Sequence, residues 1–492
     1  MRIDHHPILE NGKKLNNVTI RVDGVEVEAR EGEPIAAALA AAGIRVFRRT
    51  RKRNEPRRIF CAVGRCTDCV MTVNGLPNVR TCVTPVRDGM EIWTQQDYIP
   101  GTTTSIQYLA SSIQHPASCI EIAVIGGGPA GLAAAVEARR YGAQVTIIDE
   151  NQRPGGQLFK QIHKFFGSQE HRAGVRGYSI GKQLLQDCRE SEVDVMLETV
   201  VWGIFENNRM GLADKNGSSI IKADKIILAA GASENPLAFP GWTLPGVMGA
   251  GAVQTMMNVH RVLPGQRVLM IGSGNVGLIV AYQLLQAGAE VLAVLDAAPR
   301  LGGYFVHAAK LLRSGVPILT SHTVAEARGV DGVEEAVVVA LDDNWQPVAG
   351  TEKTFLVDLI CIAVGLSPEA DLCRMAGCQL KYLKELGGHV PIHNERMKTS
   401  VPGLYVAGDM AGIEEASSAM EEGRLAGLAA AEALGYISES EFEERARIIR
   451  RRLASLRMGA FGEIRHKAKQ ELVSDWSENS QQISADSNAD EH

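Results

Sequence analysis

The sequence lacks a strong excess of charge of either sign, a secretory signal and an apolar run that requires a membrane. Its 51 Lys and Arg against 57 Asp and Glu leave a formal net charge of -6, which gives no reason to expect nucleic-acid binding. Residues 1–6 are polar and charged, so no signal peptide is expected and a cytoplasmic location is predicted. The uncharged stretch 268–289 holds Gly272, Gly274 and Gly277, which indicate a strand, a turn and a helix rather than a membrane span.

Proline is not enriched either, at 19 residues, whereas glycine reaches 50. This imbalance favours glycine-rich ligand loops over a disordered or collagen-like chain. Hydrophobic residues make up 45% and charged residues 22%, as in ordinary globular proteins. No Ser-His-Asp triad or paired-carboxylate constellation stands out. His163 is a candidate proton donor, with a solvent-facing loop histidine as the alternative.

The N-terminal region 18–98 reads as short strands around one helix. The dipeptides Asp23-Gly24 and Asn74-Gly75 each separate two apolar runs, which predicts two tight hairpins. Residues 34–42 are rich in alanine and end at Gly43, which predicts a helix with a glycine stop. This pattern resembles a β-grasp ferredoxin domain.

Four of the nine cysteines fall in one short stretch with the spacing Cys61-x4-Cys66-x2-Cys69-x12-Cys82. A binuclear iron–sulfur cluster needs four thiolates, three of which wrap one tight loop. Gly64 allows that loop a positive φ. The hairpin turn at Asn74-Gly75 brings Cys82 back to the other three. We therefore predict these cysteines as ligands of a [2Fe-2S] cluster. The alternative, zinc, usually has two Cys-x2-Cys knuckles, and one is present here.

A basic run precedes the cysteines. It is either a solvated face, or a feature that raises the cluster potential or binds an acidic partner. Its members are Arg45, Arg48, Arg49, Arg51, Lys52, Arg53, Arg57 and Arg58.

An internal repeat follows. Residues 121–125 and 267–271 read as strands, and each leads into a glycine turn, an apolar helix and a second strand. Glu150 lies 19 residues after Gly131, and Asp296 lies 19 residues after Gly277. The glycines permit close approach of a pyrophosphate to a helix N-terminus, and an acid at that spacing binds ribose hydroxyls. Two dinucleotide-binding units are therefore predicted.

The residues after each turn suggest which cofactor it binds. Gly155-Gly156-Gln157 and a late Gly408-Asp409 pair resemble the two-dinucleotide-binding-domain flavoproteins, similar to thioredoxin reductase, in which such segments border the flavin and the ribityl chain. The resemblance implies FAD at the first unit and a pyridine nucleotide at the second. The predicted FAD residues are Gly126, Gly128, Pro129, Ala130, Gly131, Glu150, Arg153, Gly156, Gln157, Gly231, Gly408 and Asp409. Those predicted for NAD(H), or for another nucleotide such as ATP, are Gly272, Gly274, Asn275, Val276, Gly277 and Asp296.

The redox-active cysteine pair of thioredoxin reductases is absent, because Cys373 and Cys378 have the wrong spacing and place. Disulfide reduction is therefore disfavoured. The combination of a cluster domain with an FAD/NAD module is similar to the α subunits of heteromeric amine and amino-acid dehydrogenases: sarcosine oxidase, proline and hydroxyproline dehydrogenases, opine oxidase and hydrogen cyanide synthase. This chain ends before the folate-binding domain of the sarcosine oxidase α chain. No cysteine follows Cys378, so one cluster is expected.

This family resemblance implies an α/β fold with two Rossmann-like domains after a β-grasp domain. The predicted parts are a [2Fe-2S] domain at 18–98, an FAD domain at 119–240 and 353–436, an inserted nucleotide domain at 241–352, a helical tail at 437–476 and a disordered tail at 477–492. In this tail one amphipathic stripe indicates either a partner surface or packing on the FAD domain. Its residues are Phe442, Ala446, Ile449, Leu453 and Leu456.

The resemblance also implies a function and a partner. A separate β-type flavoprotein dehydrogenase subunit oxidises the substrate C–N bond, and this chain relays electrons in a hetero-oligomer. Two other functions stay open. One is a stand-alone NADH:acceptor oxidoreductase, which the acid at Asp296 supports because it suits NAD over NADP. The other is a structural subunit with ATP at the second site.

Overall fold

The computed structural model describes residues 1–9, 15–96, 119–165, 169–459 and 462–489. The chain forms two compact units, Met1–Gly101 with Glu234–Gly365, and Thr102–Ser233 with Leu366–His492. The chain passes from one compact unit to the other at 233/234 and at 365/366. The domain boundaries predicted at 240/241 and 352/353 divide the chain differently and stay predictions. The predicted linker at 98–118 lies outside the described residues. Strands β14 (Ala232–Glu234) and β23 (Leu366–Pro368) lie at the two passages of the chain between the units.

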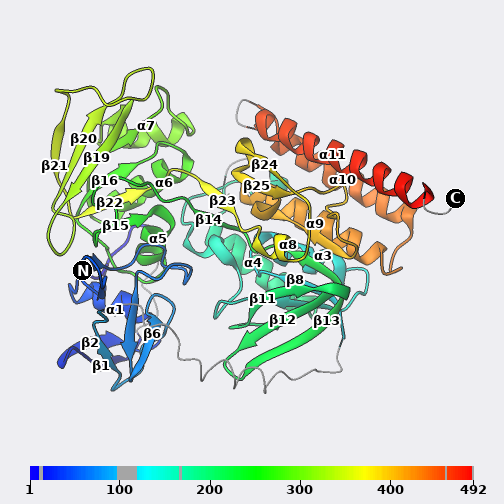
Figure 1. Cartoon of the computed structure of the whole chain (residues 1–492), viewed down its shortest axis with the longest axis horizontal. Coiled ribbons are helices and arrows are strands. Elements are labelled where there is room, and N and C mark those ends of the chain that lie inside the picture. Colours follow the sequence, from blue (N-terminus) through cyan, green and yellow to red (C-terminus); the bar gives the residue numbers. More distant parts are fainter. Residues whose placement is uncertain (10–14, 97–118, 166–168, 460–461, 490–492) are drawn as a thin grey trace. The chain divides into compact units, whose positions relative to one another are not determined.

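The N-terminal part of the first unit is a five-stranded mixed sheet in the order β2-β1-β7-β5-β6 (Figure 1). Both predicted hairpins form, with Asp23 and Asn74 at φ 49° and 48° and the following glycines also at positive φ. The alanine-rich helix α1 buries Ile35 and Leu39 completely, which contributes roughly 1.5–3 kcal/mol for each side chain. The elements are β1 (Asn17–Val22), β2 (Val25–Arg30), α1 (Ile35–Ala41), β3 (Arg48–Arg49), β4 (Pro56–Arg57), β5 (Val70–Val73), β6 (Leu76–Arg80) and β7 (Glu91–Trp93).

The rest of the first unit contains a parallel sheet in the order β15-β22-β16-β17-β18 and a three-stranded antiparallel sheet, β19-β20-β21. The uncharged stretch 268–289 forms strand β16, a glycine turn and helix α6, as predicted. No helix in the described ranges is long and apolar enough to cross a bilayer. The elements are β15 (Val247–Gly249), α5 (Ala250–Gln254), η4 (Thr255–Val259), β16 (Arg267–Ile271), α6 (Asn275–Gln286), β17 (Glu290–Asp296), α7 (Phe305–Arg313), β18 (Ile318–Thr320), β19 (His322–Arg328), β20 (Glu335–Ala340), β21 (Lys353–Leu356) and β22 (Leu359–Ile362).

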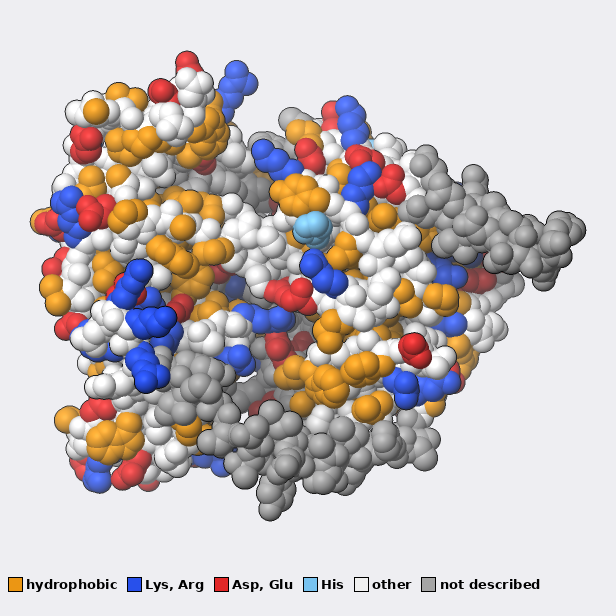
Figure 2. All heavy atoms as spheres, viewed as in Figure 1, with side chains coloured by type: hydrophobic (Ala, Val, Ile, Leu, Met, Phe, Trp, Pro, Cys, Tyr) orange, Lys and Arg blue, Asp and Glu red, His pale blue; other side chains and the backbone are white. Residues whose placement is uncertain are grey.

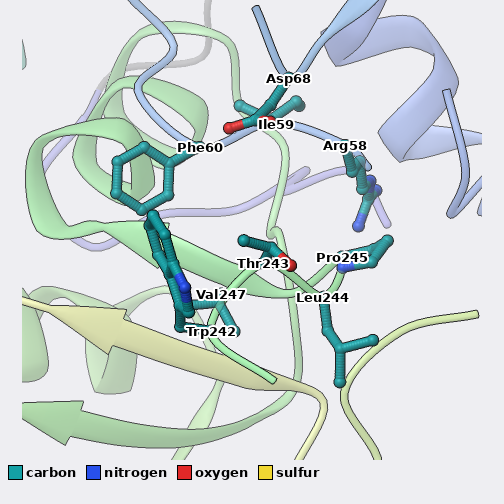
Figure 3. A pocket seen from close by; sticks show the side chains of 9 residues that line it. All are labelled: Arg58, Ile59, Phe60, Asp68, Trp242, Thr243, Leu244, Pro245 and Val247. Atoms are coloured by element: carbon teal, nitrogen blue, oxygen red, sulfur yellow. The ribbon is translucent and has the colours of Figure 1, made fainter. Parts of the chain in front are cut away.

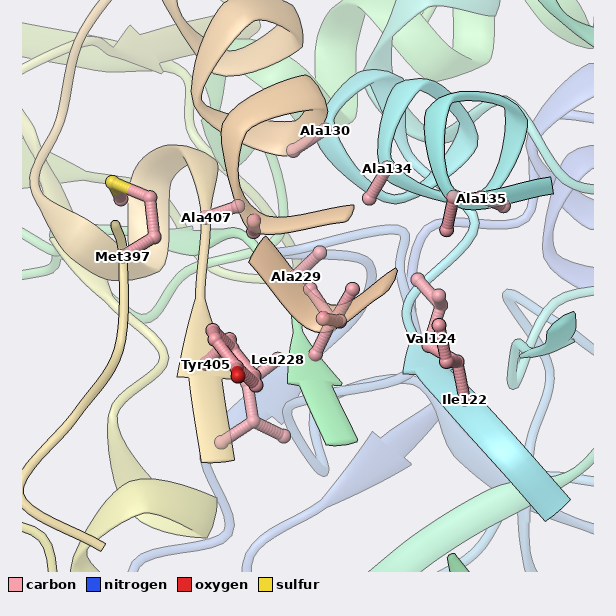
Figure 4. Close-up of a cluster of buried hydrophobic side chains, with 14 of the residues drawn as sticks. Ile122, Val124, Ala130, Ala134, Ala135, Leu228, Ala229, Met397, Tyr405 and Ala407 are labelled. Carbon is pink, nitrogen blue, oxygen red and sulfur yellow. The ribbon is translucent and has the colours of Figure 1, made fainter. Parts of the chain in front are cut away.

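The second unit is built on a seven-stranded sheet in the order β10-β9-β8-β13-β12-β11, with β26 also paired to β13. Figure 4 shows its core, in which helix α3 places Ala130 and Ala134 near strand residues such as Leu228. The elements are β8 (Cys119–Ile125), α3 (Pro129–Arg139), β9 (Val145–Ile148), η1 (Gly156–Lys160), η2 (Gln169–His171), α4 (Gly177–Glu190), β10 (Asp194–Met196), β11 (Val200–Phe205), η3 (Glu206–Asn208), β12 (Arg209–Asp214), β13 (Gly217–Leu228), α8 (Asp371–Met375), β24 (Leu380–Leu383), η5 (Lys384–Leu386), β25 (Gly388–Pro391), β26 (Leu404–Val406), η6 (Gly408–Ala411) and α9 (Ala416–Glu432).

Two C-terminal helices complete the second unit, α10 (Glu439–Leu456) and α11 (Gly462–Ala489). A capping box at Ser438 and Glu441 begins α10. Four of the five stripe residues are buried in the core that α9 also lines, and Leu456 is half-buried. The stripe therefore packs on the chain itself and does not indicate a partner. Helix α11 continues to Ala489, through a segment without proline or glycine, and the predicted disordered tail at 477–492 stays a prediction.

Candidate cofactor sites

The structure brings the four predicted cluster ligands together. Hydrogen bonds from the thiols of Cys66 and Cys82 lower the pKa of Cys61, and Cys82 lowers the pKa of Cys69 in the same way. The backbone N–H of Cys66 also points at the Cys61 sulfur, at 3.5 Å. A group of four thiols that share protons is the donor set that an iron–sulfur cluster requires, since thiolates are the ligands.

The local backbone explains how these ligands meet. The loop between β4 and β5 carries the first three, and Gly64 adopts the predicted positive φ of 75°. The β5–β6 hairpin then returns the chain to the loop. The hydroxyl of Thr81, next to Cys82, donates to the Cys69 carbonyl at 2.6 Å, which fixes the two ends of the site. Cys82 therefore lies beside Cys61 and Cys69, and its role as a cluster ligand stays a prediction.

The basic run before the cluster loop does not form a single surface. Arg48 and Arg57 both lie 3.7 Å from the carboxylate of Asp68, and Arg49 pairs with Asp331 at 2.5 Å. Residues 51–53 are exposed, and Lys and Arg side chains gather on the face shown in Figure 2. Two other members, Arg45 and Arg58, line a cavity. The run thus divides into paired, exposed and cavity-lining groups.

The first glycine turn, between β8 and α3, has the geometry of a pyrophosphate cradle. A Cβ atom on Gly126 would lie 2.4 Å from the Ala229 carbonyl oxygen, and one on Gly131 would lie 1.9 Å from the Gly126 carbonyl oxygen. A Cβ on Gly128 would meet nothing within 4 Å. Packing therefore requires the outer glycines, whereas Gly128 faces open space at the N-terminus of α3, where Pro129 is the first helical residue. A pyrophosphate fits there.

The acid beside this turn is Asp149, not the predicted Glu150. The Gly127 N–H donates to the Asp149 carboxylate at 2.7 Å, whereas Glu150 is exposed. The sheet registers pair Ile125 with Ile148 and Ile271 with Leu295, so Asp149 corresponds to Asp296. Strand β17 contains one extra residue where its register with β16 shifts, between the pairs Val268–Val291 and Leu269–Ala293, and the β8–β9 register has no such shift. Equal spacing from the glycines therefore leads to Glu150 instead of Asp149, and the role of Glu150 in FAD binding stays a prediction.

A longer repeat could have identified Asp149. The first repeat reads Asp149-x3-Arg153-Pro154-Gly155-Gly156, and the second repeat reads Asp296-x3-Arg300-Leu301-Gly302-Gly303. Counting back from the paired glycines aligns the two aspartates directly.

We expect Asp149→Asn to weaken FAD binding by roughly 1.5–3 kcal/mol, the value of a hydrogen bond to a charged group. Glu150→Gln, which removes one charge from the neighbouring position, should change FAD affinity by less than threefold. Titration of the two apoproteins with FAD, followed by flavin fluorescence, measures both effects. A larger loss in the Glu150 variant would restore the original prediction.

The remaining predicted FAD residues cluster around the same turn. The Gly155 N–H donates to the Gly127 carbonyl at 2.6 Å, and the segment folds over Gly128, since a Cβ on Gly156 would lie 2.9 Å from its Cα. Arg153 lies over the Phe159 ring, 4.3 Å from its centroid. Of the other residues predicted to bind FAD, Gln157 is exposed and Ala130 is buried. Gly231 adopts a positive φ of 79°.

His163 is not a solvent-facing loop histidine, which was the alternative to a proton donor. It is half-buried, and its ring stacks on Phe165 with the centroids 5.8 Å apart. Its role as a proton donor stays a prediction.

The Gly408-Asp409 pair begins the short helix η6, beside helix α3. Gly408 has a positive φ of 71°, and a Cβ there would lie 2.8 Å from the Ala130 Cβ. Burial raises the pKa of Asp409 to about 7. A buried, easily protonated carboxyl at this position can accept or donate a hydrogen bond to a ribityl hydroxyl.

Behind this turn lies an ion network that the sequence did not predict. The Gly408 N–H donates to one oxygen of Glu422 at 3.0 Å. The other oxygen of Glu422 accepts from Arg457 at 2.6 Å and from Lys469 at 2.7 Å. Lys469 also donates to the Ala411 carbonyl at 2.8 Å. The C-terminal helices therefore hold both ends of η6 through buried charges.

We expect Lys469→Met to lower FAD affinity at least tenfold, because it leaves Glu422 short of a buried partner and frees the Ala411 carbonyl. Lys469→Arg should recover part of the loss. The matched control is Asp475→Asn on the same helix, which breaks a surface contact of 2.6 Å to Lys381 that is worth about 0–1 kcal/mol. FAD dissociation constants and the flavin absorption spectrum separate local positioning from a general loss of stability. Equal losses of FAD in the Lys469 and Asp475 variants would contradict a specific role for Lys469.

The second glycine turn, between β16 and α6, repeats the geometry of the first. A Cβ on Gly277 would lie 2.0 Å from the Gly272 carbonyl oxygen, whereas one on Gly274 would meet nothing within 4 Å. The Asp296 carboxylate accepts from the backbone N–H of Ser273 at 2.8 Å and of Ala298 at 2.9 Å.

The loop after Asp296 closes over this turn. The Asn275 side chain accepts from the Tyr304 N–H at 2.8 Å, Val276 is exposed, and a Cβ on Gly303 would lie 2.8 Å from the Asn275 nitrogen. The residues fit a second nucleotide pyrophosphate.

Comparison with known proteins agrees with this geometry. Residues 16–97 match the 2Fe-2S iron-sulfur cluster binding domain, and residues 120–423 match pyridine nucleotide-disulphide oxidoreductase. The A subunit of opine oxidase from Agrobacterium tumefaciens (strain Ach5) is 33% identical over 336 residues, which are 65% of this chain and 66% of that protein. The alpha subunit of sarcosine oxidase from Corynebacterium sp. (strain P-1) is 25% identical over 87% of this chain and 44% of its own length.

The crystal structure of L-proline dehydrogenase from P. horikoshii is similar over 90% of this chain and 79% of that chain, with a TM-score of 0.68 and 25% identity. The matches span less than two thirds of the opine oxidase protein and less than half of the sarcosine oxidase protein. The family match itself covers more than half of this chain. The chain therefore belongs to the pyridine nucleotide-disulphide oxidoreductase family, as an FAD and iron–sulfur oxidoreductase with an N-terminal 2Fe-2S domain.

Proposed function

We propose that this chain is the electron-transferring subunit of a heteromeric, FAD-dependent amino-acid or amine dehydrogenase of the proline, hydroxyproline, sarcosine or opine type. One observation carries the proposal: a single chain combines four converging thiols with two glycine turns of the same geometry. The names of the relatives, which are subunits of opine oxidase and sarcosine oxidase, point to the same class. The proposed partner is a flavoprotein dehydrogenase subunit of the β type. The four closely spaced free thiols agree with a cytoplasmic location.

The residues of this chain bind and position carriers. Bound FAD supplies two-electron chemistry and the cluster supplies one-electron chemistry. Gly126 and Gly131 shape the pyrophosphate turn, and Asp149 offers a carboxylate to a ribose. Asp409 holds a proton beside the η6 turn, because its pKa of about 7 leaves it partly protonated at neutral pH.

The second nucleotide site decides between this function and its alternatives. If NADH binds there, the stand-alone NADH:acceptor oxidoreductase gains support, because the isolated chain then has its own reductant. If ATP binds there instead, the site is structural. Asp296 supports NAD(H) over NADP(H), since an acid at this place in a dinucleotide-binding turn usually binds the ribose hydroxyls, and the binding measurement has to separate NADH from ATP.

Asp296→Ala should therefore weaken NADH binding by roughly 1–3 kcal/mol, the cost of leaving a buried polar group without its partner. The measurement is quenching of protein fluorescence by NADH, with ATP as the competing nucleotide. FAD content is the internal control and should not change. Tight ATP binding without NADH binding in the native chain would favour the structural role.

The test of the proposed function uses the native complex. Affinity purification of the full chain should recover a second flavoprotein, and the complex should reduce a dye with one of the four substrates. The chain alone should show NADH–dye activity at most. A homogeneous preparation of this chain alone that oxidises proline, hydroxyproline, sarcosine or an opine would overturn the proposal.

A further inference from the structure

A cavity of about 50 Å³ lies within the first unit, where the cluster loop packs on the second nucleotide-binding domain. Arg45 and Arg58 line it from the cluster domain, and Pro245, Gly332 and Asp358 line it from the other domain. One water molecule needs about 10–15 Å³ of such space. The cavity therefore accommodates several non-hydrogen atoms, which is the size of a small oxyanion.

The packing around this cavity is close and ordered. The Gly249 N–H donates to the Phe60 carbonyl at 3.1 Å, and the Phe60 and Trp242 rings meet edge to face with centroids 6.3 Å apart. Figure 3 shows the neighbouring pocket, where the Arg58 side chain extends towards Pro245. Arg58 also lies over the Phe47 ring of the cluster domain, 5.9 Å from its centroid, so its side chain is packed and does not extend into solvent.

The charges in the cavity are unbalanced. The Nε nitrogen of Arg58 is shielded from solvent and has no hydrogen-bond partner among the residues that the structure describes. Burial and the nearby charge of Arg45 lower the pKa of Arg58 to about 10. Asp358 is the acid that opposes them, but its oxygens already accept the backbone N–H groups of Gln266 at 2.8 and 3.0 Å and of Arg267 at 2.8 Å.

A buried guanidinium N–H without a hydrogen-bond partner is costly, and two adjacent guanidinium groups repel each other. Planar guanidinium groups bind oxyanions through paired, charge-assisted hydrogen bonds. We propose that this cavity binds a small oxyanion of the phosphate type between Arg45 and Arg58. The anion would join the cluster domain to the second nucleotide-binding domain. The site is separate from both glycine turns, so the proposal does not depend on which nucleotide binds there.

The test compares thermal unfolding of the full, cluster-loaded chain in sodium phosphate and in sodium chloride of equal ionic strength. Wild-type protein should unfold at a higher temperature in phosphate, because an anion bound to the folded state stabilises it. Arg58→Met should lose this response. In chloride the same variant should be at least as stable as the wild type, since it removes a buried Nε–H that has no hydrogen-bond partner and a charge that Arg45 repels.

Arg53→Met is the matched control. It removes the same charge from the turn between β3 and β4, five residues earlier in the chain, but its side chain is 80% exposed and does not line the cavity. It should keep the full response to phosphate, and Arg45→Met should lose it. Titration calorimetry with inorganic phosphate should show at least a tenfold loss of affinity in the Arg58 variant. The proposal is overturned if wild-type protein gains no more stability from phosphate than Arg58→Met does, or if Arg58→Met is destabilised in chloride.

Discussion

Replacing Cys69 with serine is expected to remove the iron–sulfur cluster while FAD stays bound. The Cys69 thiol is buried and shares a hydrogen bond with Cys82, so both lie on the inner side of the four-thiol group. A serine hydroxyl keeps its proton at neutral pH and is a poor substitute for a thiolate on iron. Iron, acid-labile sulfide and the visible charge-transfer absorption should all be lost together, and the flavin absorption should remain.

Cys119→Ser is the control for this experiment. Cys119 is exposed and begins strand β8, far along the chain from the cluster loop, so its replacement should leave iron and sulfide unchanged. Zinc without labile sulfide in the wild-type protein would contradict the cluster assignment and favour the tetrahedral site that the four thiols could also form.

The features that the sequence predicted are those set by short-range geometry. Asp23-Gly24 and Asn74-Gly75 form their hairpins because both positions adopt a positive φ, which few other residues allow. The two glycine turns were also predictable from the local sequence. A side chain at Gly131 or Gly277 would collide with a backbone carbonyl only five residues earlier in the chain.

The features that the sequence did not predict depend on distant contacts. Lys469 and Glu422 are 47 residues apart, and Arg457 and Glu422 are 35 apart, so no local pattern joins them. A charged face of a helix usually faces water. Here helices α10 and α11 place these cations against the buried side of the η6 turn. The structural equivalent of Asp296 is Asp149 and not Glu150, because a spacing counted from the glycines does not reveal the register shift within strand β17.

Gly131→Val is expected to abolish FAD binding. A Cβ at this position would lie 1.9 Å from the Gly126 carbonyl oxygen, a distance that no relaxation of a flexible side chain can relieve, because the obstacle is backbone. The glycine turn must therefore move away from the N-terminus of α3, and the pyrophosphate loses both its close approach and the aligned N–H groups. Overpacking of this kind costs about 1–3 kcal/mol or more, and a loss of 3 kcal/mol corresponds to roughly a hundredfold weaker binding.

Gly277→Val provides the reciprocal control, because its Cβ would lie 2.0 Å from the Gly272 carbonyl oxygen in the equivalent turn of the first unit. Each variant removes one nucleotide site and leaves the other. FAD content after gel filtration should therefore fall to near zero in Gly131→Val and stay at the wild-type value in Gly277→Val. Binding of the second nucleotide, measured by fluorescence quenching, should show the opposite pattern. Full FAD content in Gly131→Val, or loss of FAD in Gly277→Val, would mean that the two turns have been assigned to the wrong cofactors.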